Sequence, residues 1–203
     1  MKSYSNTYMF LYVSALVVII AVVLSLVSLG LKPRREANVQ AEKALQILKA
    51  SGYAHVERAQ AIAAFDSLAE EEPSRSDGEM YRIRCADGST GHVIPLQGKG
   101  LWGAIWGYAV LSDDLTTIKG VSFAHKSETP GLGAKITEEA FERSFEGKKL
   151  YDADGHFVSV KVVPKGKGET IAEENRVDAI SGATITSRGV DKMLADGFQR
   201  IKE

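Results

Sequence analysis

The chain has 203 residues and a formal net charge of −1, from 25 Lys and Arg against 26 Asp and Glu side chains. This balance lacks the basic excess that nucleic-acid binding requires, so we expect no nucleic-acid partner. The one cysteine, Cys85, excludes an internal disulfide and a site built from several thiolates, and we expect a small buried side chain there.

The first feature along the chain is an apolar run. Residues 8–31 carry no charged side chain and consist mainly of Val, Leu, Ile and Ala, which is long enough to cross a bilayer. The basic stretch 32–35 follows directly, unlike the small residues of a cleavage site. We therefore expect a short tail at 1–7, an uncleaved transmembrane helix at 8–31 and one domain over 32–203. Because only Lys2 precedes the run, the positive-inside rule places that domain in the cytoplasm.

The domain is expected to begin with helices and to continue with strands. Helical composition covers 36–70, as one helix over 36–50 and a second over 55–70. Two hairpins follow, because Asp87-Gly88 and Asp113-Asp114 each lie between apolar runs. The four runs expected to form strands are 80–85, 92–96, 105–111 and 118–123.

Three further elements are expected beyond the hairpins. A short helix over 137–145 has its first residue, a threonine, as N-cap. Residues 157–163 alternate as a half-exposed strand, with Val158, Val160 and Val162 on one side and Ser159 and Lys161 on the exposed side. An amphipathic helix over 187–202 closes the chain, after a sheet-and-loop region over 80–187. The expected fold class is α+β: one N-terminal transmembrane helix and a single domain with a largely antiparallel sheet flanked by helices.

A turn of small residues leads into the last helix. Residues 178–187 read Asp-Ala-Ile-Ser-Gly-Ala-Thr-Ile-Thr-Ser, with Thr186 or Ser187 as the expected N-cap and Thr184 just outside the helix. Such a turn leaves backbone N–H groups at the positive end of the helix dipole, where an anion such as phosphate binds readily. On these residues alone, a capped loop-to-helix junction is the simpler explanation.

Two earlier loops have unusual sequences. Residues 98–102 read Gly-Lys-Gly-Leu-Trp, which is not a phosphate loop because its glycine spacing and the Ser or Thr after Lys are missing. By composition alone this segment is a flexible turn with a core Trp. Residues 128–133 read Glu-Thr-Pro-Gly-Leu-Gly, which by itself predicts an ordinary type II turn.

Together, in this order, the three segments resemble the family of FMN-binding domains found in the C subunits of Na⁺-translocating NADH:quinone reductases and in the G subunits of Rnf complexes. The string Asp-x-x-Ser-Gly-Ala-Thr over 178–184 matches the flavin-attachment motif of that family residue for residue. There the last Thr carries FMN through a phosphoester bond, so the resemblance implies Thr184 as the attachment site. The segment 98–102 is more similar to the C subunits, whereas the short region before the first hairpin keeps the Rnf G subunit as the alternative.

The resemblance also implies roles for the neighbouring residues. Glu128 and Thr129 would hydrogen-bond the polar edge of the flavin ring, Leu132 would pack on its face, and the glycines would let the backbone approach. Asp178 lies in the sequence that a Mg²⁺-dependent flavin transferase reads when it installs FMN from FAD. The implied FMN contacts are Asp178, Ser181, Gly182, Ala183, Thr184, Thr186 and Ser187 in the last segment, Glu128, Thr129, Gly131, Leu132 and Gly133 in the second, and Lys99, Gly100, Leu101 and Trp102 in the first.

The function that the resemblance implies is electron transfer within a multi-subunit membrane complex. Such a complex oxidises NADH, reduces ubiquinone and exports Na⁺, and this subunit alone is not catalytically complete. Its redox group is the flavin, so no side chain is expected to be catalytic. The chain has no dinucleotide-binding fingerprint of its own. The family's flavin domain lies on the periplasmic side of the bacterial inner membrane, against the positive-inside rule, and we follow the family here.

Other functions have weaker support. No metal site is expected, because no short ligand spacing relates the four histidines, His55, His92, His125 and His156. A serine hydrolase built on Ser181, His125 and Asp178 lacks the Gly-x-Ser-x-Gly pattern. Two alternatives remain: the G subunit of an Rnf complex, with ferredoxin and NAD⁺ at the ends of that complex, and a cofactor-free membrane-anchored assembly or scaffold subunit in which Thr184 is unmodified.

Overall fold

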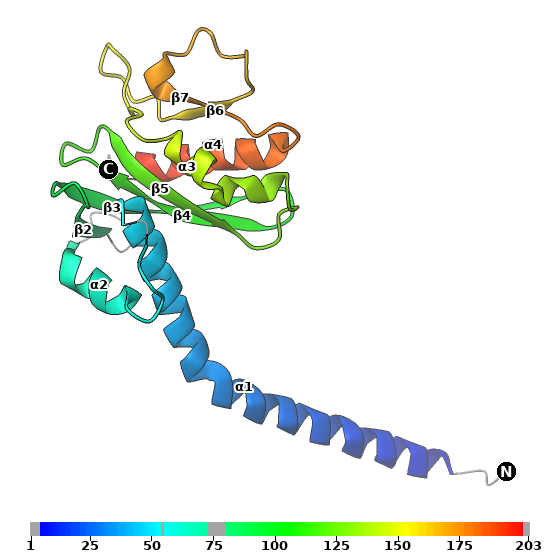
Figure 1. The fold of residues 1–203 in the computed structure, drawn as a ribbon. Coiled ribbons are helices and arrows are strands. Elements are labelled where there is room, and N and C mark those ends of the chain that lie inside the picture. Colours follow the sequence, from blue (N-terminus) through cyan, green and yellow to red (C-terminus); the bar gives the residue numbers. More distant parts are fainter. Residues whose placement is uncertain (1–4, 54, 73–79, 201–203) are drawn as a thin grey trace. The chain divides into compact units, whose positions relative to one another are not determined.

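The structure is a computed structural model that describes residues 5–53, 55–72 and 80–200. The chain divides into two compact units, Met1–Ala41 and Glu42–Glu203. The first unit is helical, and the second combines a sheet with helices (Figure 1). The predicted α+β class, with one long apolar helix before an antiparallel sheet, is confirmed.

Helix α1 covers Asn6–Ala50 as one continuous helix that contains Pro33. In the part of the chain that the structure describes, it is the one helix long and apolar enough to cross a membrane. The sequence predicts a separate helix over 36–50 after the anchor. These residues instead continue α1, because the missing N–H of proline costs one hydrogen bond while good helix formers stand on both sides.

The last turns of α1, within the second unit, pack against the sheet. Ile47 and Leu48 are fully buried beside strand residues of the same apolar cluster, Val93 and Val110. A side chain at Gly120 would overlap the Ala50 carbonyl oxygen, so a glycine at this position permits the close approach.

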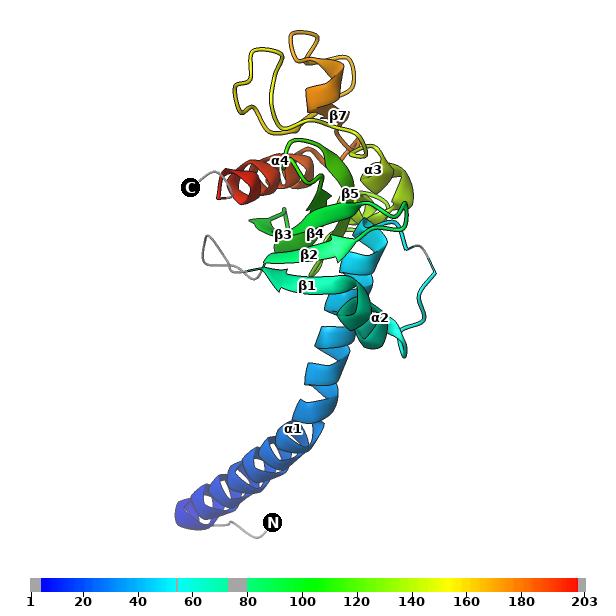
Figure 2. The same cartoon turned by 90° about the vertical axis from the view of Figure 1, so that its left-hand side faces the viewer.

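The five-stranded sheet has the order β1-β2-β3-β4-β5, and every neighbouring pair is antiparallel. Figure 2 shows β1 to β4 side by side. The two predicted hairpins are confirmed. The strands are β1 Ala69–Glu72, β2 Met80–Arg84, β3 Thr90–Lys99, β4 Ala104–Leu111 and β5 Ile118–His125.

The predicted helix over 55–70 is wrong at both ends. Only Ala61–Leu68 is helical, as α2, and the chain then enters β1. Alanine and glutamate favour a helix, but here the backbone of β1 pairs with β2, with Ala69 opposite Ile83. A tertiary contact therefore overrides the local preference.

The opposite sheet face is covered by α4, Thr184–Gln199 (Figures 1 and 2). Its buried side chains include Val190, Met193, Leu194 and Phe198. They share a core with Leu96 and Ile105 of the sheet and with three packed rings, Phe123, Phe141 and Phe145.

Short elements complete the second unit: η1 Gly133–Thr137, α3 Glu139–Arg143, β6 Lys161–Val163, η2 Glu173–Asn175 and β7 Arg176–Asp178. Strands β6 and β7 form a parallel pair. The predicted helix over 137–145 is shorter, with Glu138 as its N-cap residue, because the Thr137 hydroxyl donates to the Ala134 carbonyl instead.

The predicted strand over 157–163 is also shorter, since only β6 is regular. Ser159 has a φ of +57° and is buried, contrary to the expected exposed position. The amides of Val158 and Ser159 both donate to the Leu150 carbonyl, a bulge that interrupts the alternation.

Candidate functional site

Thr184 is the first residue of α4 and is exposed to solvent. The chain reaches it through Gly182, whose φ of +78° favours glycine, and through a turn in which the Ala183 amide donates to the Ile180 carbonyl. The first backbone N–H groups of a helix have no partner within the helix, so they are directed toward the region around Thr184. This geometry suits a hydroxyl group that is to carry a phosphate.

The helix begins earlier than predicted, with Ala183 rather than Thr186 or Ser187 as its N-cap residue. The first regular bond of the helix runs from the Ser187 amide to the Ala183 carbonyl. Thr184 is therefore inside the helix rather than outside it. The predicted end at 202 extends into residues 201–203, which lie outside the described residues.

The four hydroxyl groups of this segment differ in accessibility. Ser181 and Thr184 are exposed, whereas Thr186 and Ser187 are each 1% exposed. Thr186 Oγ1 donates a 2.6 Å hydrogen bond to Glu128 Oε2, and Ser187 Oγ accepts one of 3.1 Å from the Ile180 amide. The two buried hydroxyl groups are thus already engaged within the protein.

Glu128 connects all three motif segments. Its side chain is 4% exposed, and Oε1 accepts a 2.8 Å hydrogen bond from the Trp102 amide while Oε2 accepts from Thr186. Side chains at Gly100 or Gly133 would overlap these oxygen atoms. Sequence reasoning proposed Glu128 as a contact of the ring edge; in the structure both of its oxygens bind groups of the chain itself.

The loop 128–133 lies beside the turn before α4. Gly131 has a φ of +75°, and the amides of Leu132 and Ala134 both donate to the Thr129 carbonyl. The Leu132 side chain lies 3.0 Å from the position that a Cβ atom at Gly182 would occupy. This loop therefore presents an exposed leucine next to the Ser-Gly-Ala-Thr turn.

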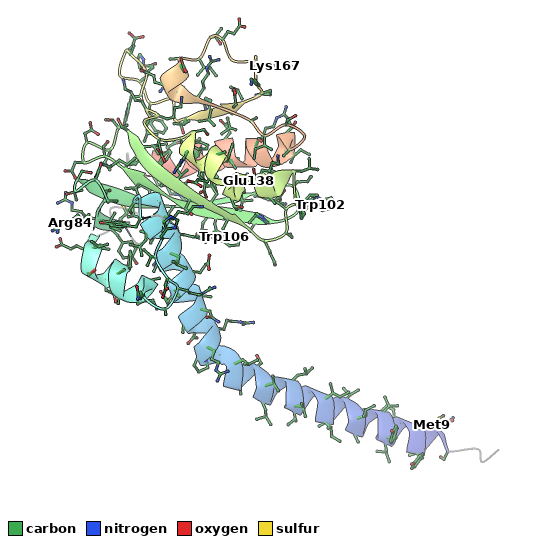
Figure 3. The ribbon with its side chains drawn as sticks, in the orientation of Figure 1. Met9, Arg84, Trp102, Trp106, Glu138 and Lys167 are labelled. Atoms are coloured by element: carbon green, nitrogen blue, oxygen red, sulfur yellow. The ribbon has the colours of Figure 1, made fainter. Side chains whose placement is uncertain are left out.

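The turn between β3 and β4 lies on the other side of Glu128. The Gly100 amide donates to the Gly103 carbonyl, and Ser127 Oγ donates to the Trp102 carbonyl at 2.9 Å. Trp102 is 64% exposed and projects from the end of the sheet (Figure 3), so the core Trp that composition alone predicts is wrong. The flavin contact that the resemblance implies for Trp102 stays a prediction. Trp106, by contrast, is half-buried.

Exposed apolar side chains concentrate around these segments. After residue 31, six large apolar side chains of the described chain are exposed, and four belong to the three motifs: Leu101, Trp102, Leu132 and Ile185. Isolated exposed apolar residues are ordinary, but a group drawn from adjoining loops indicates a binding surface. A planar aromatic ring suits such a surface, so the residues present fit the FMN that the resemblance implies.

The structure brings most predicted site residues together, with exceptions. Glu128 bonds join the first, second and last segments, and Leu132 adjoins Gly182. Asp178 is exposed at the end of β7, and Lys99 is exposed at the end of β3. Within residues 80–200, neither side chain forms a hydrogen bond to the other motif residues.

Sequence reasoning missed Ile185 as an exposed apolar group and the bond between Glu128 and Thr186. A helix that begins at Thr184 includes Ile185, and a helical projection places Ile185 outside the face that contains Val190 and Leu194. The bond spans 58 positions and leaves no local pattern.

A second group of polar side chains lies in a surface loop. Ligand atoms of Asp152, Asp154 and His156 lie within 4.8 Å of one another. Asp152 Oδ1 accepts hydrogen bonds from the amides of Asp154 and His156, which lowers the pKa of this carboxyl and accounts for the loop conformation.

Known proteins are similar to this chain in sequence and fold. A family model described as "FMN-binding domain" matches residues 100–199. The C subunit of the Na⁺-translocating NADH-quinone reductase from Neisseria meningitidis is 38% identical over 121 residues, which are 59% of this chain and 45% of that protein. The C subunit of the same reductase from Pasteurella multocida is 38% identical over 132 residues, 64% of this chain and 49% of the relative. The chain thus spans about half the length of the curated relatives it matches.

Solved structures extend the similarity over most of the chain. The crystal structure of the C subunit of the Na⁺-translocating NADH-quinone reductase from Parabacteroides distasonis has a TM-score of 0.76 and 34% identity, covering 85% of this chain and 95% of that one. A protein from Shewanella oneidensis named NqrC has a TM-score of 0.65 over 79% of this chain and 94% of its own, and its 24% identity supports the fold alone.

Proposed function

Because the chain belongs to the family of the C subunits of Na⁺-translocating NADH-quinone reductases, we propose that it carries electrons through an FMN esterified to Thr184. The observation that supports this most directly is the exposed Thr184 hydroxyl at the first position of α4, beside four exposed apolar side chains. The hydroxyl provides the point of attachment, the start of the helix provides N–H groups for the phosphate, and the apolar surface accommodates the ring.

The flavin supplies the redox chemistry when bound, and the chain supplies position. Leu132 and Trp102 are the side chains that we assign to the ring. Both are exposed, the Trp102 amide donates to Glu128, and Leu132 lies beside Gly182. Covalent attachment makes binding of the ring intramolecular and so abolishes its dissociation.

Attachment requires a transfer reaction and therefore a partner enzyme. In the proposed reaction the Thr184 oxygen forms a bond to the FMN phosphorus of FAD, the pyrophosphate bond breaks and AMP leaves. The hydroxyl proton passes to AMP or water. The reaction is a phosphoryl transfer, and no group is oxidised or reduced. A Mg²⁺-dependent flavin transferase is the proposed catalyst, and Asp178 belongs to the segment that it reads.

We further propose that the protein works as one subunit of a multi-subunit complex that oxidises NADH, reduces quinone and transports Na⁺. Residues 8–31 would anchor it in the bacterial inner membrane, and the flavin domain would lie on the periplasmic side. The relatives named above are all C subunits of this reductase, which favours this complex over an Rnf complex.

The test is to express the full chain with a flavin transferase and to look for flavin fluorescence on a denaturing gel. Thr184→Ala is expected to lose the fluorescence and the mass increment of FMN. Ser67→Ala, which removes an exposed hydroxyl outside the three motif segments, is the matched control and is expected to keep both. Bare polypeptide in the parent chain would favour the cofactor-free scaffold, and fluorescence that survives Thr184→Ala would reject the ester assignment.

A further inference from the structure

We propose that Glu128 is a positioning residue that selects Thr184 as the modified hydroxyl by fixing where α4 begins. This inference rests on the proposed function, because it concerns the choice among hydroxyl groups of the attachment segment. Glu128 does not touch the transferred group in this role; it acts through Thr186.

The local sequence leaves the start of α4 ambiguous. Ala183, the N-cap residue, makes no side-chain capping bond, and the first turn holds no acidic residue. Thr186 and Ser187, by contrast, are good capping residues, and they were the caps that the sequence predicted. A helix that began there would leave Thr184 in the preceding coil and would use the Thr186 hydroxyl as a cap.

The buried carboxylate decides between the two helix starts. Thr186 Oγ1 donates to Glu128 Oε2 at 2.6 Å and is then turned inward instead of toward its own backbone N–H groups. Glu128 is itself held in place, since Oε1 accepts from the Trp102 amide and its own amide donates to His125 Nδ1. The position of Glu128 relative to the sheet is therefore fixed independently of α4.

The helix geometry then sets the direction of Thr184. Successive residues of an α-helix are rotated by about 100°, so residues two apart project about 200° apart. When the Thr186 side chain points inward, the Thr184 side chain therefore points outward. The exposures agree with this geometry, since Thr186 is 1% exposed and Thr184 is exposed. The contact with Glu128 both hides one threonine and presents the other.

The experiment measures FMN loading of the full chain, co-expressed with a flavin transferase and sampled before loading is complete. Glu128→Gln keeps the shape of the side chain, but its amide N–H₂ group faces one of the two present donors, the Trp102 amide or the Thr186 hydroxyl. Thr186→Val keeps the shape of threonine and removes the donor. We expect each variant to lower FMN at Thr184 by about tenfold, the scale of a lost hydrogen bond to a buried charge.

Three controls separate positioning from general damage. Thr186→Ser, which retains the hydroxyl, and Glu138→Gln, which changes an exposed carboxylate ten residues away, are expected to load within about twofold of the parent chain. The double variant of Glu128→Gln and Thr186→Val is expected to load no worse than the poorer single variant, because both remove the same contact. Exchange of the Ser187 amide, which donates to the Ala183 carbonyl, is measured without flavin and is expected to become faster in both single variants.

The outcomes are distinguishable. Loading of Glu128→Gln and Thr186→Val equal to that of Glu138→Gln, in a system where the parent chain is loaded, overturns the positioning role and leaves the proposed function intact. A parent chain without flavin overturns the proposed function itself. If Glu128→Gln fails to fold, Thr186→Val against Thr186→Ser decides the question: equal loading rejects the role, and a loss confined to Thr186→Val supports it.

Discussion

Lys49 Nζ lies 2.5 Å from Glu142 Oε2, a carboxylate oxygen that is buried against β5. The other oxygen, Oε1, accepts a 2.8 Å hydrogen bond from the Phe123 amide. This ion pair joins the last turn of α1 to α3 and to the sheet. Among the described residues Oε2 has no hydrogen-bond donor besides this cation, and burial raises the pKa of the Glu142 carboxyl despite Lys49 and Phe123.

The raised pKa predicts a pH dependence of stability. The folded chain keeps the Glu142 proton to a higher pH than the unfolded chain, whose pKa is near the ordinary 4.5. Its contribution to folding stability is therefore fully present below pH 4.5 and is lost as the pH rises through the folded pKa. We expect Glu142→Gln to remove this slope and Lys49→Met to enlarge it, in denaturant titrations of the full chain in detergent micelles. Identical slopes in the two variants would contradict the assignment.

Asp87 provides the opposite case. Hydrogen bonds from Ser89 and Lys119 lower the pKa of this exposed carboxyl. Its contribution is present above the ordinary pKa of 3.8 and is lost as the pH falls through the lowered value. Asp87→Asn should therefore reduce stability at neutral pH and leave it unchanged in strong acid. Asp66→Asn, which changes an exposed aspartate of α2, is the matched control.

Replacing either of two glycines in α4 by alanine is expected to change stability by different amounts. A side chain at Gly189 would overlap the backbone carbonyl of Lys99, whereas one at Gly197 would overlap only a methyl group of Leu96. Alanine favours a helix over glycine by about 1 kcal/mol, and overpacking costs about 1–3 kcal/mol. We expect Gly189→Ala to destabilise the chain by ~1–2 kcal/mol and Gly197→Ala to stay within about 1 kcal/mol of the parent, because a leucine can rotate and a backbone cannot. Equal denaturation midpoints for Gly189→Ala and Gly197→Ala would contradict this, because they would show that the backbone at Lys99 can move to make room.

The sheet was predictable because its information is local. Strands β2 to β5 alternate or carry apolar runs, and turn residues separate the members of each hairpin. Strand β1 was not predictable, since Ala-Glu-Glu-Glu favours a helix and becomes a strand only by pairing with β2. The burial of Ser159 was not predictable for a related reason. Its left-handed backbone conformation depends on the Leu150 carbonyl, which accepts from the amides of both Val158 and Ser159.

For the candidate site, the sequence indicates which segments to consider but not the hydrogen bonds between them. The three motif segments and Thr184 could be named from the residues that they contain. The start of α4 could not, because the group that captures Thr186 lies 58 positions away along the chain, at Glu128. Sequence reasoning assigned Glu128 to the ring and the capping role to Thr186, and each assignment omitted the other residue.

The exposure of Trp102 leads to the last prediction, which separates a flavin contact from a packing residue. Trp102 is held by its backbone, through its amide to Glu128 and its carbonyl to Ser127, so Trp102→Ala keeps both bonds. Its side chain is largely in solvent, and we expect a stability change below about 0.5 kcal/mol. With FMN attached as proposed, loading at Thr184 should also be unchanged. Iodide should quench the flavin fluorescence more strongly, because the proposed ring contact of Trp102 is removed. Trp106→Ala is the matched control: this half-buried side chain, on β4 (Figure 3), should lower stability and leave quenching as in the parent chain. If quenching in Trp102→Ala equals that in the parent chain, the ring does not lie against this turn, and Leu132 becomes the contact to test next.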